Sequence, residues 1–315
     1  MNRVLLLLII SSFFFSACQK DLSSINTNPS IIAGLDSTYL DTVYFADIRS
    51  GVTDTQKIFS YRYDAMKRLT LAKWVSSKST TIFKDSGSIS FSYISNDSLP
   101  YRAQAIRTYD LGRTFDTSTK FYFYDLTGRL IKDSTVGSSN NFNTTFTSSL
   151  SITGYVYLPG QVSCYSTNSV TSTNPTYNSN STEKDTSFIN TDGNILKTVF
   201  YNLNIGSGVF RKVMETNITY DNRPISYLNL NIFHSMSSVF NSYTELFPPF
   251  DGKRSTKNPL SVTNTYYDTF GNITGTIVWN HAYTYTPDGF PQSSSYDDPY
   301  GQSRRIQYQY KYKKM

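Results

Sequence analysis

The chain has 315 residues, a formal net charge of +6 and only two cysteines. Its length allows one large or two modest domains with a substantial core, and its richness in Tyr (26) and Phe (21) favours strands over helices. Positive residues are scattered except for a cluster between Arg304 and Lys314, which we interpret as a solvated strand face, so no nucleic-acid partner is expected.

The first 17 residues have the features of a bacterial export signal. Arg3 supplies one positive charge, and the apolar run Val4–Phe15 is too short to cross a membrane comfortably. The stretch "FSAC" that ends at Cys18 resembles the lipobox of bacterial lipoproteins, which implies that Cys18 is lipidated and becomes the first mature residue. Acyl chains such as palmitate contribute about 0.8 kcal/mol per buried methylene, so they would anchor the chain to a membrane. An ordinary secretory signal peptide is the alternative.

The residues after Cys18 bear on location. Gln19 resembles the sorting position of lipoproteins that pass to the outer membrane, and Lys20-Asp21 resembles the surface-export signals of Bacteroidetes-type bacteria. The periplasmic and cell-surface faces both stay open. Residues 18–38 are polar and predict a tether, and residues 39–315 predict a single domain. No later segment has the roughly 18 apolar residues that a membrane-spanning helix needs.

The segment "KFYFYDLTGRLIKDSTV", residues 120–136, predicts a hairpin. Asp125 stands at the first position of a turn and Gly128 at the fourth, as in a three-residue loop with a G1 bulge. Similar punctuation recurs at irregular spacing, at Tyr63-Asp64, Tyr109-Asp110, Asp192-Gly193-Asn194, Tyr220-Asp221, Tyr267-Asp268 and Asp288-Gly289. We therefore predict an all-β fold: a curved, many-stranded antiparallel meander, either an open sheet or barrel-like.

Two C-terminal stretches alternate with period two, as half-buried strands do. Near the C-terminus one face holds Ile306, Tyr308, Tyr310 and Tyr312. In the stretch before it, one face holds Trp279, His281, Tyr283 and Tyr285. Residues 134–187 are instead dense in Ser, Thr and Asn, and predict either long loops or mobile hairpins, with short strand pieces at 152–158 and 162–165.

One segment has helical spacing. Apolar residues recur at intervals of three and four between Asn231 and Phe247, and Pro248-Pro249 follows. This pattern predicts one amphipathic helix, about 232–247, that covers the sheet. A membrane-surface or partner-docking helix is the alternative, although the Lys and Arg flank of such helices is missing.

The units "YRYDAMKRL", "YFYDLTGRL" and "YYDTFGNI" resemble the tyrosine-aspartate repeats of the Rhs family. Together with "FDGKRSTKNPLSVTNTYYD" and "YTYTPDGFPQSSS", they resemble an uncharacterised family of Bacteroidetes lipoproteins with a porin-like fold. The resemblance covers the C-terminal third well and the middle loosely; Thr256 and the order Pro259-Leu260 depart from the family pattern. It implies a curved many-stranded sheet or barrel and no known activity.

The sequence lacks motifs for common chemistry. His234 and His281 stand far apart, no Cys or His pair has metal-ligand spacing, and no phosphate loop or nucleophile elbow is present, so we expect no metal, no cofactor and no enzyme. Cys164 has no partner once Cys18 is acylated. The less favoured alternative is a glycoside hydrolase, with a carboxylate pair from Asp297-Asp298 or from Glu245 with Asp251.

Binding is the remaining class of function. The face that holds Trp279, His281, Tyr283 and Tyr285 could stack on sugar rings if it is accessible, or belong to the core. A scaffold could instead dock an envelope protein through a sheet edge or the basic C-terminal strand. A transmembrane barrel is disfavoured because Tyr alternates with Lys and Gln. We predict an outer-membrane-anchored lipoprotein that acts as a binding or scaffolding module, with a surface glycan-binding protein as the alternative.

Overall fold

The computed structural model describes residues 38–78, 81–109, 114–126, 128–141, 145–173, 176–192, 194–204, 207–224, 257–299 and 303–315. These residues form 17 strands. The first nine are β1 (Thr38–Arg49), β2 (Val52–Tyr63), β3 (Leu69–Lys78), β4 (Thr81–Tyr93), β5 (Pro100–Tyr109), β6 (Thr114–Tyr124), β7 (Leu130–Asn141), β8 (Thr145–Leu158) and β9 (Gln161–Thr173). The others are β10 (Thr176–Ile189), β11 (Ile195–Asn204), β12 (Val209–Pro224), β13 (Lys257–Tyr267), β14 (Ile273–Asn280), β15 (Ala282–Tyr285), β16 (Pro291–Asp297) and β17 (Arg304–Lys314).

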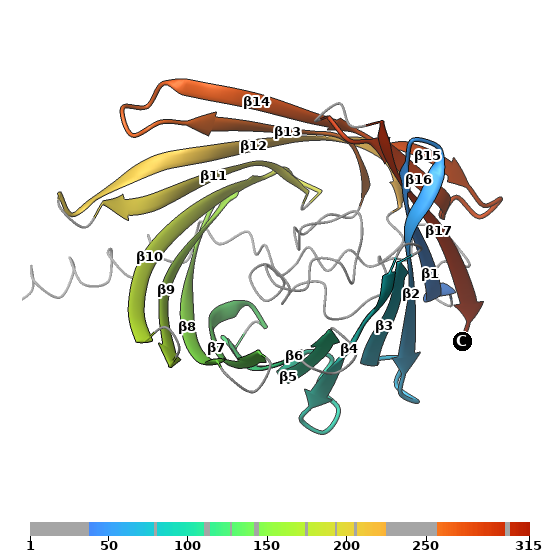
Figure 1. Ribbon diagram of the computed structural model, residues 1–315, viewed down its shortest axis with the longest axis horizontal. Coiled ribbons are helices and arrows are strands. Elements are labelled where there is room, and N and C mark those ends of the chain that lie inside the picture. The colour runs from blue at the N-terminus through green and yellow to red at the C-terminus, as the bar shows by residue number, and fades with distance from the viewer. Residues whose placement is uncertain are drawn as a thin grey trace, which may run out of the picture.

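The strands form one antiparallel meander that closes on itself. Each strand from β1 to β13 pairs with the next in the chain, β15 pairs with β16, β16 with β17, and β17 with β1. Strands β14 and β15 follow one line interrupted at His281, whose N–H donates to the Leu260 carbonyl (2.9 Å) and so extends the pairing with β13. Figure 1 looks into the resulting ring. The all-β prediction is confirmed, and the sheet is barrel-like rather than open.

No helix occurs among the described residues, and so none there is long and apolar enough to cross a membrane. The predicted helix at 232–247 lies outside the described residues, as do Cys18, the signal peptide and most of the predicted tether.

Two sequence predictions need correction. Of the two alternatives for residues 134–187, long loops are wrong and hairpins are correct, because these residues complete β7 and form β8, β9 and β10, all paired on both sides. Thr tolerates strand geometry well, and the polar side chains here pair across strands, as Thr153 and Ser166 do at 2.9 Å. Tyr220-Asp221 is not a turn, because β12 continues to Pro224.

The hairpin at Asp125 has the predicted form. Gly128 has φ 80° and donates its N–H to the Asp125 carbonyl (3.0 Å), and the pairing register shifts between Phe123 and Tyr124. The Asp125 carboxylate accepts from the backbone N–H (3.0 Å) and Nε (2.7 Å) of Arg129. The turn at Asp64 repeats these bonds, with Arg68 in the place of Arg129.

The recurring tyrosine before the turn fastens each strand end to the preceding strand. Six tyrosine hydroxyls donate to backbone carbonyls at strand starts over 2.6–2.9 Å: Tyr63 to Leu40, Tyr93 to Leu69, Tyr124 to Pro100, Tyr157 to Leu130, Tyr220 to Ile195 and Tyr312 to Pro291. The turn arginine then packs on the next tyrosine, as Arg68 does on Tyr93 at 4.5 Å. A tyrosine near the end of a strand, followed by Asp in three of these six cases, thus joins that strand to the start of the preceding one.

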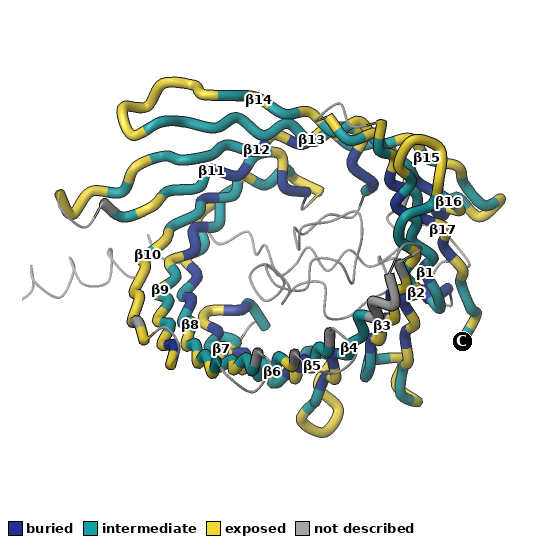
Figure 2. The backbone as a smooth tube through the Cα atoms, viewed as in Figure 1, coloured by how far each residue is buried: buried dark blue, intermediate teal, exposed yellow. Residues whose placement is uncertain are grey.

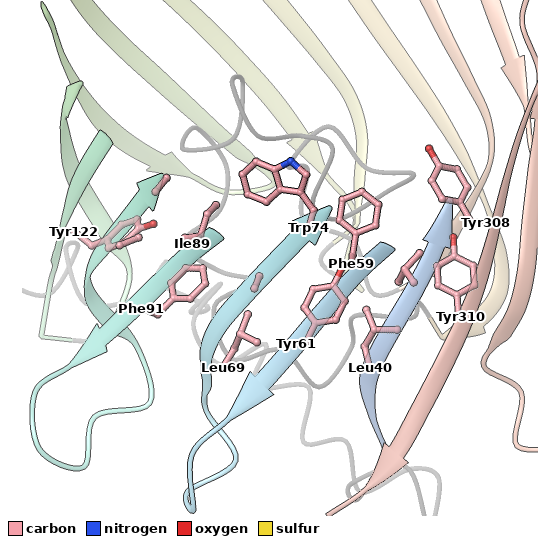
Figure 3. Packing of buried hydrophobic residues seen from close by; sticks show 14 of the residues in the cluster. Leu40, Phe59, Tyr61, Leu69, Trp74, Ile89, Phe91, Tyr122, Tyr308 and Tyr310 are labelled. Atoms are coloured by element: carbon pink, nitrogen blue, oxygen red, sulfur yellow. The ribbon is translucent and has the colours of Figure 1, made fainter. Parts of the chain in front are cut away.

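The core lies on the inner face of part of the ring, from β17 through β1 to β9. Figure 3 shows side chains of this cluster side by side on one face of adjacent strands, and Figure 2 shows the buried residues along the inner side of the ring. Its largest members are Phe59, Tyr61, Trp74, Phe91, Tyr122, Tyr155, Tyr308 and Tyr310. The predicted alternation of 305–313 is confirmed, because Ile306, Tyr308 and Tyr310 are buried.

Candidate functional site

The predicted aromatic stripe lies along β14 and β15 and faces the interior. Trp279, His281, Tyr283 and Tyr285 are all half-buried, whereas the residues between them are exposed. Tyr283 pairs across the sheet with Ser294, whose hydroxyl bonds to the Tyr310 hydroxyl in the core (2.7 Å). The four side chains therefore share the face that Tyr310 uses.

The rings of this stripe stack on one another. The centroids of His281 and Tyr283 lie 6.2 Å apart with an interplanar angle of 24°, and those of Tyr283 and Tyr285 lie 6.0 Å apart with an angle of 28°. Tyr296 of β16 tilts against His281 at 4.9 Å. The result is a continuous aromatic surface, which we call the stacked wall: His281, Tyr283, Tyr285 and Tyr296.

Two polar atoms of the stacked wall are shielded from solvent and lack a hydrogen-bond partner: Nδ1 of His281 and the hydroxyl of Tyr283. Burial lowers the pKa of His281 to about 4, so its ring is neutral at pH 7. Burial also raises the pKa of Tyr283 well above its ordinary value, so its hydroxyl keeps its proton. A buried polar group without a partner costs about 1–3 kcal/mol, and the Tyr122 hydroxyl in the core shares this state.

Charged and amide groups lie at one end of the stacked wall. The Tyr285 hydroxyl donates to the Asp221 carboxylate, and the Arg223 guanidinium lies 4.4 Å from the Tyr285 ring centroid. The side-chain amide of the buried Asn258 donates to the same carboxylate over 3.3 Å. Burial is the main cause that raises the pKa of Tyr285, followed by its bond to Asp221. Sequence reasoning missed these three partners because they come from β12 and β13, distant in the chain.

A second polar cluster lies across β6, β7 and β8. Nζ of Lys120 lies 3.0 Å from the Asp133 carboxylate, and both side chains are almost completely buried. The Tyr155 hydroxyl donates to the same carboxylate over 2.5 Å. Burial lowers the pKa of Lys120 to about 8, against the opposing effect of Asp133. The sequence could have indicated this cluster, because Lys120 stands two residues before the buried Tyr122 and therefore lies on the same face of β6.

The candidate carboxylates of a hydrolase do not form a free pair. Asp298 lies 3.1 Å from Nη1 of Arg304, and Asp297 lies 3.2 Å from Nε of Arg305. Glu245 and Asp251 lie outside the described residues. Within the described part of the chain, no group of three or more His, Cys, Asp or Glu side chains is placed to hold a metal ion.

The remaining candidates from the sequence are Cys164 and the basic strand β17. Cys164 is buried and unbridged, and burial raises the pKa of its thiol. The basic strand β17 pairs along both edges, with β1 and with β16, so it offers no free edge for strand addition. The scaffold hypothesis therefore has no sheet edge to use at this strand.

No family model and no curated protein sequence matches the chain. Two solved structures are similar in fold. A porin-like protein from Bacteroides vulgatus ATCC 8482 is 10% identical with a TM-score of 0.49, over 88% of this chain and 100% of that one. A porin-like protein from Bacteroides uniformis ATCC 8492 is 12% identical with a TM-score of 0.40, over 88% of this chain and 99% of that one. Membership of a lipoprotein family stays a prediction.

Proposed function

We propose that the protein is an outer-membrane-anchored lipoprotein whose barrel binds a glycan on the stacked wall of its inner face. The observation that supports this most is the pair of unsatisfied polar atoms, the Tyr283 hydroxyl and Nδ1 of His281, within a surface of stacked rings. Flat aromatic rings suit the apolar faces of sugars, and sugar hydroxyls can both donate and accept. Both atoms are shielded from solvent in the free protein, so the proposal requires the stacked rings to move apart as a sugar enters. Nδ1 of the neutral His281 can then accept a hydrogen bond, and the Tyr283 hydroxyl can donate one.

The neighbouring charged groups fit the same ligand class. Asp221 is held by Tyr285 and Asn258, and carboxylate and amide groups can fix the orientation of a sugar that stacks on rings. A purely apolar ligand would leave both Nδ1 of His281 and the Tyr283 hydroxyl unpaired, and an anion, which only accepts, would leave Nδ1 of His281 unpaired.

The membrane attachment proposed here is a lipid at Cys18 and not a membrane-spanning wall. The outward-facing positions near the middle of β3 and β5 include the exposed Lys73 and Gln104. Lysine or arginine on a lipid-facing strand costs about 2–4 kcal/mol at the bilayer midplane. We therefore place the barrel beside the bilayer.

The test separates binding from stability by removing one oxygen. Tyr283→Phe keeps the ring and deletes the unsatisfied hydroxyl, whereas Tyr124→Phe deletes a hydroxyl that bonds to the Pro100 carbonyl far from the wall. On a polysaccharide array, we expect wild type and Tyr124→Phe to be retained alike. We expect Tyr283→Phe to lose affinity about fivefold, which corresponds to about 1 kcal/mol for one hydrogen bond.

Thermal melts of the same three proteins complete the experiment. Tyr283→Phe should melt at or above the wild-type temperature, because it removes an unpaired buried group. Equal retention of Tyr283→Phe and wild type would contradict the site, and absence of retention of wild type on every glycan would contradict the ligand class.

A further inference from the structure

We infer that one end of the barrel is a membrane-contacting surface, where exposed apolar side chains of successive turns enter the lipid interface. This end, the terminal rim, is where β1 begins, β17 ends and the even-numbered strands β2 to β10 end. The inference rests on the proposed lipid anchor and adds the orientation of the barrel on the membrane.

Apolar residues lie in or directly beside four successive turns at the terminal rim. Met66 follows β2, Ile94 follows β4, Leu126 follows β6 and Leu158 ends β8, with exposed fractions of 48%, 59%, 108% and 51%. Turn positions usually hold Gly, Pro, Asn, Asp or Ser. Exposed apolar residues also occur at turns of the opposite rim, as Phe270 (89%) and Val209 (58%) do, so exposure makes both rims candidates for a covered surface and the position of the proposed anchor selects between them.

Strand residues next to these turns extend the apolar surface. Phe123 near the end of β6, Ile131 near the start of β7 and Phe188 near the end of β10 are all exposed. Because consecutive turns of a barrel end lie around one rim, a flat surface can contact several of them together. A bilayer interface is such a surface, and it accepts apolar side chains to a depth of about 5–10 Å.

The path of the chain identifies lipid as the occupant. Cys18 precedes Thr38, the first residue of β1, by 20 positions, and β1 starts at the terminal rim beside Lys314 of β17. A flexible chain of that length has a root-mean-square span of about 25 Å. A lipid on Cys18 would therefore hold the terminal rim, rather than the opposite rim, next to the bilayer.

The chain offers a matched pair of turns for the test. Leu126 lies in the turn where Gly128 N–H donates to the Asp125 carbonyl at the terminal rim (3.0 Å). Phe270 lies at the opposite rim, in a turn where Gly271 N–H donates to the Asp268 carbonyl (3.1 Å). Phe270 is 89% exposed, so the two sites differ in rim and hardly in local structure.

The experiment uses the full lipidated protein in phosphatidylethanolamine and phosphatidylglycerol vesicles. Leu126→Cys and Phe270→Cys are each labelled with bimane; Cys164 is buried and Cys18 is acylated in the proposed protein. We expect nitroxides on the lipid chains to quench bimane at position 126 and not at position 270, and aqueous iodide to do the reverse. Met66→Cys should behave like Leu126→Cys.

Flotation of the vesicles separates the possible failures. If the protein floats but iodide quenches positions 66, 126 and 270 alike, the membrane-contacting rim is overturned while the lipid anchor stands. If the protein does not float, the anchor and the rim contact are both overturned, and glycan retention on the array remains a separate result.

Discussion

The two walls of the barrel are held together differently. The wall from β17 through β1 to β9, which we call the cluster wall, contributes every buried member of the hydrophobic cluster. The wall from β10 to β16, which we call the polar wall and which includes the stacked wall, buries a higher share of polar side chains, among them Thr186, Thr198, Thr216, Asn258 and Ser294. Both walls have the same meander topology and the same antiparallel pairing, so the difference lies in the side chains alone.

This difference indicates a division of roles. A contiguous apolar cluster supplies folding free energy without needing partners, at about 25 cal/mol per Å² of apolar surface buried. Buried polar atoms without a partner occur in both walls, at Tyr122 of β6 as well as at His281 and Tyr283, and the latter two belong to the proposed site. If the proposed function is correct, the folding free energy from the cluster wall offsets the free-energy cost of the unsatisfied polar atoms in the binding site.

The largest effect is expected where the cluster wall contains a buried charge pair. Asp133→Asn leaves Lys120 buried without its counter-charge, and breaking such a pair costs about 3–5 kcal/mol. Asp288→Asn is the control, because its partner Lys314 lies 3.9 Å away and both side chains are mostly exposed, so its loss should cost under about 1 kcal/mol. Guanidinium unfolding of both variants measures the contrast. Equal losses of unfolding free energy would show that the buried pair of Lys120 and Asp133 stabilises the protein no more than the exposed pair.

A close contact in the cluster wall predicts the next effect. A Cβ on Gly87 would overlap the Trp74 ring and lie 2.6 Å from the Ile106 carbonyl oxygen, so Gly87→Ala should destabilise by about 3 kcal/mol. Gly154 lies in β8 with nothing within 4 Å of its Cβ position, and Gly154→Ala should be neutral or slightly stabilising. Melting temperatures decide this, and a tolerated Gly87→Ala would mean that Trp74 can move.

The pH dependence of stability should divide between the walls. The pKa of Lys120 falls from 10.5 to about 8 on folding, so the unfolded chain binds more protons between these values and stability should rise with pH there. The pKa of His281 falls from 6.5 to about 4, so stability should be lost as pH falls through that window. The free energy of unfolding should change by roughly 3 kcal/mol across each window.

Two substitutions test whether Lys120 and His281 cause these changes in stability with pH. Lys120→Met should remove the alkaline rise and leave the acid loss, and His281→Gln should do the opposite. Above about pH 10, buried tyrosines whose pKa is raised, such as Tyr61 and Tyr122, should lower stability in all variants, because only the unfolded chain ionises them. Urea unfolding across pH measures the slopes. Unchanged curves in both variants would rule out these two residues as the cause.

The smallest expected effect concerns the tyrosines at strand ends. Tyr124→Phe removes the bond to the Pro100 carbonyl (2.9 Å) and should cost about 1 kcal/mol. Tyr101→Phe, at an exposed position, should cost nothing measurable. A neutral Tyr124→Phe would mean that the repeated tyrosines do not stabilise the junctions between hairpins.

The sequence predicted the features that are local. Period-two alternation placed Tyr308 and Tyr310 on the buried face, because neighbouring side chains on a strand point to opposite sides. The turn at Asp125 followed from residue types within four positions. Closure of the barrel did not follow, because Thr38 pairs with Lys314 across almost the whole chain and no local pattern records that contact.

The candidate site was predictable only in part. The alternation identified the shared face of His281, Tyr283 and Tyr285, but their partners Asp221 and Asn258 depend on pairing between distant strands. The wrong loop prediction for 134–187 has a different cause. Composition alone underrates strands rich in Ser and Thr, which are stabilised here by pairing on both sides.

The most direct measurement is hydrogen–deuterium exchange of the backbone amides, with and without a glycan that the array retains. We expect the amides of β1 to β9 and β17 to exchange most slowly and to be unaffected by the glycan, and those of β14 to β16 to exchange faster and to slow when the glycan binds. Protection that is equal in both walls, or a glycan effect confined to β1 to β9, would contradict the division between a stabilising wall and a binding wall.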